Sequence, residues 1–143
     1  KRSPAKTRET LQRARQAFQD EKCVVIFPSC KLAKEIDGKL TEQTWFSTVV
    51  SLARKYSAPI QPLNVKARNS WLFYNLSRLN GELRDITLFN ELLNKKGGKF
   101  EMTFGPLISP DQLDGDANAL TNALKDHVAS ELACDPDQPF KGV

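Results

Sequence analysis

The chain has 143 residues, of which 40% are hydrophobic and 27% charged, with a formal net charge of +4. This is the composition of an ordinary globular protein, and the length suits a single domain over residues 1–143. No apolar run approaches the ~18 residues of a membrane span. The 21 basic and 17 acidic residues are too evenly balanced to identify a nucleic-acid-binding protein.

The three cysteines are odd in number and lack metal-ligand spacing, which favours a reduced, cytoplasmic compartment over a disulfide scaffold. No signal peptide is visible. The sequence starts at Lys1 and its only methionine is Met102, so we expect it to be a fragment of a longer protein.

Residues Lys1–Glu21 are predicted to form an amphipathic helix, capped by Ser3 and with Pro4 at its first helical position. The basic side chains of Lys6–Arg15 lie on its outer face. A solvated face explains them better than contact with phospholipid headgroups does.

Cys23–Phe27 is predicted to be a buried central strand, because it is short and rich in β-branched residues, and Pro28 ends it. Ligands of α/β proteins usually bind beyond the carboxyl ends of such strands. The loop Pro28–Lys31 is therefore the first candidate site.

Lys31–Leu40 is predicted to be a polar loop with a turn at Asp37–Gly38, followed by a helix over Thr44–Tyr56. Ile60–Val65 alternates as a strand does, and a helix before a strand suggests a crossover parallel to the first strand. The fold class is therefore predicted as α/β, with a mixed, mostly parallel sheet flanked by helices.

The helix predicted at Ser70–Leu79 is apolar on all sides, so it is either buried or in contact with something apolar outside the domain. Asn80–Gly81 is a turn, and Ile86–Leu93 is ambiguous between strand and helix. The basic glycine-rich turn Lys95–Lys99 leads into a strand at Phe100–Phe104.

Asp116–Ala133 is predicted to be a second amphipathic helix, and the tail Asp135–Val143 is expected to fray. The acidic cluster Asp114–Asn118 resembles the start of a calcium loop. However, Ala119 and Lys125 replace its essential glycine and glutamate, so helix capping explains the cluster better and no metal site is predicted.

Cys30 would be a candidate nucleophile only if a base lay nearby. The only histidine, His127, stands beside Val128 in an apolar row, so it is interpreted as a structural or surface residue. The sequence therefore offers no convincing general base, and no catalytic residue is assigned.

Several segments, in order, resemble the glycerophosphate/lysophospholipid acyltransferase superfamily, and most of all its bacterial hemolysin-like branch. Val24–Cys30, followed by Trp45, resembles the third motif, and Ala58–Pro62 resembles the fourth. The downstream segments that agree are Ala67–Ser70, Leu72–Tyr74, Glu91–Gly97 and Phe104–Ile108. The resemblance covers Arg2–Ile108.

This resemblance implies an α/β acyltransferase that transfers a fatty acyl group from acyl-CoA or acyl carrier protein to a lysophospholipid-type acceptor. The thioester would be a co-substrate, and no cofactor is implied. The family uses a His-x-x-x-x-Asp pair as base and orienter. No such pair is present here, so this carboxyl-terminal portion is expected to be inactive alone.

The resemblance also implies site residues and a location. Cys30 and Lys31 stand where the branch has glycine and glutamate, and Ala33 where it has serine. Lys31 would then neutralise a substrate phosphate, or else the loop is degenerate. A cytoplasmic location with peripheral contact to the inner membrane is expected. The implied acceptor contacts are Ser29, Cys30, Lys31 and Arg68, and the implied acyl-chain or membrane contacts are Trp71, Phe73 and Tyr74.

Two alternatives remain open. One is a non-catalytic binding module that keeps the fold and has lost the chemistry. The other, which the charge balance disfavours, is a nucleic-acid-binding domain that uses the basic helix face Lys6–Arg15.

Overall fold

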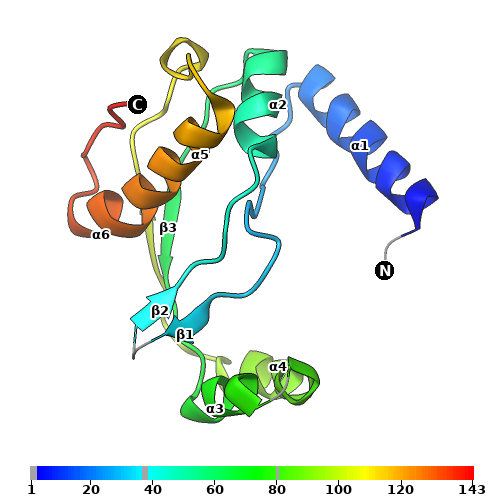
Figure 1. The fold of residues 1–143 in the computed structure, drawn as a ribbon, viewed down its shortest axis with the longest axis vertical. Coiled ribbons are helices and arrows are strands. Elements are labelled where there is room, and N and C mark those ends of the chain that lie inside the picture. Colours follow the sequence, from blue (N-terminus) through cyan, green and yellow to red (C-terminus); the bar gives the residue numbers. More distant parts are fainter. Residues whose placement is uncertain (1–2, 37–38, 80) are drawn as a thin grey trace.

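The computed structural model describes residues 3–36, 39–79 and 81–143. Figure 1 shows a central body that contains α2 (Thr48–Tyr56), α5 (Ala117–Asp126) and α6 (Leu132–Cys134). Helix α1 (Pro4–Gln19) projects from one side of this body. A pair of helices, α3 (Trp71–Leu79) and α4 (Gly81–Asn94), lies at the far end of the molecule.

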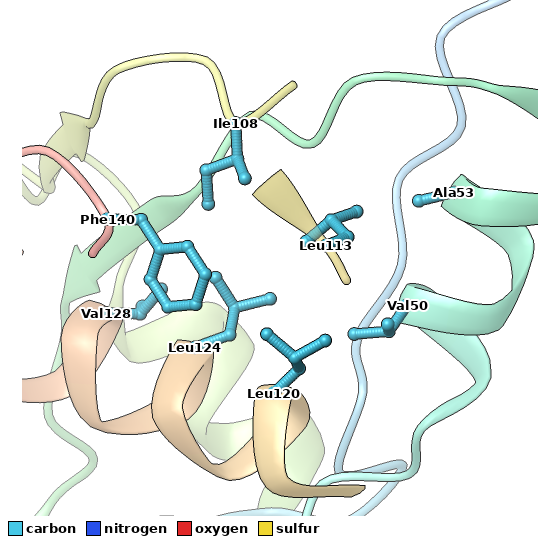
Figure 2. Close-up of a cluster of buried hydrophobic side chains, with 8 residues drawn as sticks. All are labelled: Val50, Ala53, Ile108, Leu113, Leu120, Leu124, Val128 and Phe140. Carbon is cyan, nitrogen blue, oxygen red and sulfur yellow. The ribbon is translucent and has the colours of Figure 1, made fainter. Parts of the chain in front are cut away.

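The main hydrophobic core lies between α2, α5 and the segments around them. Figure 2 shows apolar side chains from these elements converging on one another. A large part of the core therefore comes from the carboxyl-terminal third of the chain. Its buried members are Val50, Ala53, Ile108, Leu113, Leu120, Leu124, Val128 and Phe140.

The described strands form two separate antiparallel pairs. Strand β1 (Lys34–Ile36) pairs with β2 (Lys39–Thr41). Strand β3 (Leu63–Lys66) pairs with β4 (Glu101–Phe104), and an isolated bridge between Ile60 and Ile108 continues that contact toward the core. The protein is thus α/β only in the loose sense of helices combined with small antiparallel sheets.

The predicted mostly parallel sheet is wrong for the described part of the chain. The crossover prediction fails because β3 pairs antiparallel with β4, which follows it in sequence beyond α3 and α4. The polar loop expected over residues 31–40 instead contains β1 and the start of β2. The turn predicted at residues 37–38 lies outside the described residues.

The segment Cys23–Phe27 is not the buried central strand that the sequence suggested. It belongs to no strand, although Pro28 accepts a hydrogen bond from the Phe46 amide (3.1 Å). Val25 and Phe27 are 72% and 79% exposed. The prediction failed because an apolar run indicates only that a segment favours burial. It does not show whether another strand lies beside that segment.

The helix predictions were more successful, because caps and periodicity are local signals. Ser3 caps α1 by accepting a hydrogen bond from the Lys6 amide, and Pro4 is its first residue. Yet α1 touches the body mainly near its end, where Phe18 stacks on Tyr56 with ring centroids 4.7 Å apart. The ambiguous segment 86–93 is helical and lies within α4.

The carboxyl-terminal helix is interrupted by a π-helical turn at His127–Glu131 and then resumes as α6. The tail that follows was expected to fray, but its Phe140 is buried and lies edge-on to His127, with ring centroids 5.5 Å apart. The tail is therefore attached to the core at Phe140.

Candidate functional site

The loop Pro28–Lys31 is a tight turn whose shape is set by its own hydrogen bonds. The Cys30 amide donates to the Phe27 carbonyl (3.2 Å), and the Ser29 hydroxyl donates to the Lys31 carbonyl (2.9 Å). Ser29 is buried, whereas Cys30 and Lys31 are exposed. Of the three predicted acceptor contacts here, Cys30 and Lys31 can meet a ligand directly, and Ser29 holds the turn.

Cys30 has a φ of 51°, in the left-handed region that glycine adopts without strain. A glycine at this position would adopt the same backbone without strain.

The Cys30→Gly variant is expected to be more stable than the parent chain by about 0.5–1 kcal/mol, since strain relief exceeds the extra unfolded-state entropy of glycine. Urea unfolding followed by circular dichroism would measure this difference. A loss of stability would mean that the Cys30 thiol, 3.6 Å from the Phe27 carbonyl oxygen, contributes more than the strain costs.

Arg68 lies in the loop that follows β3, beside a shallow hollow. The hollow is open to solvent, has a volume of about 350 Å³ and is lined by Leu40, Lys66, Ala67 and Arg68. The Arg68 guanidinium lies over the Tyr74 ring, 5.8 Å from its centroid, and contacts Glu35 at 3.4 Å. Arg78 of α3 binds the same carboxylate at 3.0 Å.

Two arginines thus share one acidic side chain, which leaves a net positive charge beside the hollow. Glu35 is mostly buried, while Arg68 and Arg78 remain more than half exposed. When an aromatic ring and a carboxylate contact one side of an arginine guanidinium, several of its N–H donors stay free for an incoming anion. The hollow therefore offers cationic side chains to a phosphate or carboxylate.

The Arg68 loop is fixed by Glu91 of α4, which the sequence analysis did not single out. The Glu91 carboxylate accepts hydrogen bonds from the Ser70 amide (2.8 Å), the Ser70 hydroxyl and the Lys95 ammonium (2.9 Å). Lys95 also donates to the Asn69 side chain (2.8 Å). Burial alone would raise the pKa of Glu91, but the bonds from Ser70 and Lys95 hold it below its usual value.

The three aromatic residues predicted to touch an acyl chain or a bilayer lie in different environments. Phe73 and Tyr74 are buried and meet edge to face, with ring centroids 5.4 Å apart. The Tyr74 hydroxyl accepts a hydrogen bond from the Asn69 amide (3.2 Å). Trp71 alone is exposed, so it is the only one of the three that can meet a bilayer directly.

His127 is buried, as a structural histidine would be. Its Nδ1 lies 2.7 Å from a Glu131 carboxylate oxygen, one turn further along the π-helical segment. Its Nε2 is buried without a hydrogen-bond partner among the described residues. A ring closed in by Phe140 cannot reach a substrate, so the pair is not placed to act as a general base.

The structure brings Arg68 together with Tyr74, since the guanidinium lies 5.8 Å from the centre of the ring. The hollow beside Arg68 is lined by described residues of β2, β3 and the loop after β3, and the Pro28–Lys31 loop is not among them. The two acceptor contacts Lys31 and Arg68 are therefore treated as separate candidates.

Asp116 caps α5 by accepting hydrogen bonds from the amides of Asn118 and Ala119 (3.1 and 2.8 Å), as the capping interpretation predicted. In the described ranges, no group of three or more His, Cys, Asp and Glu side chains is arranged to hold a metal ion. None of the described helices is both long enough and apolar enough to cross a membrane.

No protein-family model matches this chain, and neither a curated protein nor a solved structure matches it.

Proposed function

We propose that this chain is the acceptor-binding part of an acyltransferase domain. The full reaction would transfer a fatty acyl group from acyl-CoA or acyl carrier protein to a lysophospholipid-type acceptor at the cytoplasmic face of a membrane. The observation that carries the proposal is the placement of Arg68 beside an open hollow that Lys66 also lines.

The charges around the hollow favour an anionic headgroup. Lys66 pairs with Glu101 at 2.7 Å, but both side chains are largely exposed, so solvent competes with this pair. Arg68 contacts Glu35 at 3.4 Å, long enough for its fork of N–H donors to turn toward a phosphate. Lys31, on the other candidate loop, would add a point charge for a second anionic group.

The chemistry also needs a base. The acceptor oxygen attacks the thioester carbonyl carbon, its proton passes to a base, and the carbon–sulfur bond breaks to release a thiolate. His127 is buried and paired with Glu131, so it does not supply that base. We therefore assign the base to polypeptide other than this chain. This chain alone is expected to catalyse no acyl transfer.

Binding of a short-chain lysophosphatidate below its micelle concentration tests the proposal by NMR titration. We expect signals around Arg68 to shift, and Arg68→Gln to weaken binding about tenfold or more, as for the loss of a charged hydrogen bond. Arg13→Gln is the matched control, because Arg13 is an exposed arginine of α1 paired with Glu9.

Three other outcomes would contradict the proposal. Equal binding by the Arg68→Gln variant would remove its central residue. Binding of duplex or single-stranded nucleic acid with a steep salt dependence, weakened by Arg13→Gln, would instead support the nucleic-acid alternative. If the chain binds no phospholipid, no thioester and no nucleic acid, the result would favour the alternative of a non-catalytic binding module.

A further inference from the structure

Among the described side chains of helix α4, polar ones are buried while several large apolar ones are exposed to solvent. The side chains that it turns toward the rest of the chain include Thr87 and Glu91, which are buried. Ile86, Phe89 and Leu93 project from the opposite side of the helix, because they lie about half a turn around from Glu91 or Thr87.

Large apolar side chains on both helices are left in solvent as a result. Six large apolar side chains of α3 and α4 are each between 70% and 79% exposed. We call these six residues, named at the end of this paragraph, the hairpin apolar surface. Ile86, Phe89 and Leu93 lie on one stripe of α4, at positions i, i+3 and i+7, and an exposed apolar stripe of this kind marks a contact with something apolar. Its members are Trp71, Leu79, Ile86, Phe89, Leu92 and Leu93.

The inward Glu91 explains why the helix cannot simply turn over to bury this surface. Its carboxylate binds Ser70 and Lys95, and these bonds hold the start of α3 and the end of α4 together. Rotating α4 would break them and leave a carboxylate without its partners. The outward direction of Phe89 and Leu93 is thus fixed by a polar contact on the other side of the helix.

The charges at the end of α4 indicate what covers the surface. Lys96 and Lys99 lie in the turn that follows α4, three and six residues beyond Leu93, and both are exposed. Lysine is depleted in protein–protein interfaces, but it is favoured beside anionic lipid headgroups, as tryptophan is at the membrane boundary. Of the three acidic residues of α4, Glu82 and Asp85 lie near its amino end, and Glu91 is buried and paired with Lys95.

We infer that the α3–α4 hairpin docks the protein on an anionic bilayer. The carboxyl-terminal half of α4 enters the headgroup region, Trp71 lies at the boundary, and Lys96 and Lys99 contact the lipid phosphates. Helices of 9 and 14 residues lie in the membrane plane and do not cross it. The inference rests on the proposed function only in that a lysophospholipid acceptor resides in a bilayer.

Vesicle sedimentation tests the inference, with phosphatidylcholine vesicles prepared with and without phosphatidylglycerol. We expect the chain to prefer the anionic vesicles. Phe89→Ser and Leu93→Ser should each weaken binding about tenfold, by the apolar area that each side chain would bury. Leu11→Ser is the matched control, because Leu11 is an exposed leucine of α1 and its loss should leave binding unchanged.

Two further readouts separate the lipid contacts. Lys96→Gln and Lys99→Gln should each weaken binding to anionic vesicles about fivefold, and have little effect on neutral ones. In a Trp45→Phe background, the fluorescence of Trp71 should shift to shorter wavelength on anionic vesicles, because its ring leaves water.

Absence of binding to both kinds of vesicle would overturn the inference, and so would equal binding by Phe89→Ser, Leu93→Ser and the parent chain. Self-association in the absence of lipid that Phe89→Ser abolishes would assign the surface to a second copy instead. Titration with monomeric short-chain lysophosphatidate, without vesicles, reports on Arg68 alone. Failure of the docking inference is therefore distinguishable from failure of the proposed function.

Discussion

The Glu91→Ala variant should lose about 2–4 kcal/mol of stability in the α3–α4 hairpin, because it removes a buried carboxylate and leaves its donors unpaired. Glu91 is 4% exposed and binds Ser70 and Lys95. Since Ser70 belongs to the Arg68 loop, that loop should loosen as well. Amide hydrogen exchange in α3 and in residues 67–70 would measure the effect locally.

An exposed ion pair of the same chemistry provides the control. Lys66 and Glu101 are 2.7 Å apart, but the Glu101 side chain is 64% exposed. Glu101→Ala should therefore cost no more than about 1 kcal/mol. Equal losses in the two variants would mean that Glu91 does not organise the hairpin.

The same carboxylate should make the hairpin sensitive to acid. The pKa of Glu91 is lower in the folded chain than its usual value of 4.5, so the ionised form stabilises the fold. This contribution is complete above pH 4.5 and is lost as the pH falls through the lower folded pKa. Glu91→Gln should flatten the pH dependence of exchange in α3 over that range.

The contrast between helix α1 and the Glu91 contact shows what this sequence can predict. Helix α1 was predictable because Ser3 and Pro4 act on neighbouring residues. The Glu91 contact was not, because Ser70 lies 21 positions away and a lone glutamate in a helix is usually a solvent-facing residue.

Single residues of the candidate site were predictable from the sequence, but their contacts were not. The sequence indicated Arg68 as an anion contact, but it gave no sign that Glu35 and Tyr74 would hold the guanidinium from behind. Glu35 lies 33 positions from Arg68, and Tyr74 belongs to the helix that follows the Arg68 loop, so periodicity carries no information about either contact. The segment 86–93 was ambiguous for a related reason, since its apolar residues face outward and its buried ones are polar.

The second large effect is expected where β4 meets the carboxyl-terminal helix. Leu132 of α6 is fully buried, and its side chain packs where a side chain on Gly105, just after β4, would have to lie. Leu132→Ala should cost about 2–5 kcal/mol through lost burial and the remaining cavity. The unfolding midpoint in urea would measure this loss.

Gly105 offers a reciprocal test of the same contact. A methyl group there would lie 2.8 Å from one Leu132 terminal carbon and 3.0 Å from the Pro62 ring. Gly105→Ala alone should therefore cost about 1–3 kcal/mol through overpacking. In the Leu132→Ala background that methyl group gains space, so the double variant should be more stable than the sum of the two losses predicts.

A coupling of about 1 kcal/mol or more in this double-mutant cycle would show that Leu132 and Gly105 share one packing site. That site matters for function because β4 pairs with β3, and β3 leads directly into the Arg68 loop. Additive losses would mean that Pro62 alone limits the space at Gly105. The β3–β4 pair would then be anchored chiefly through Asn64, whose side-chain amide donates to the Val128 carbonyl at 2.8 Å.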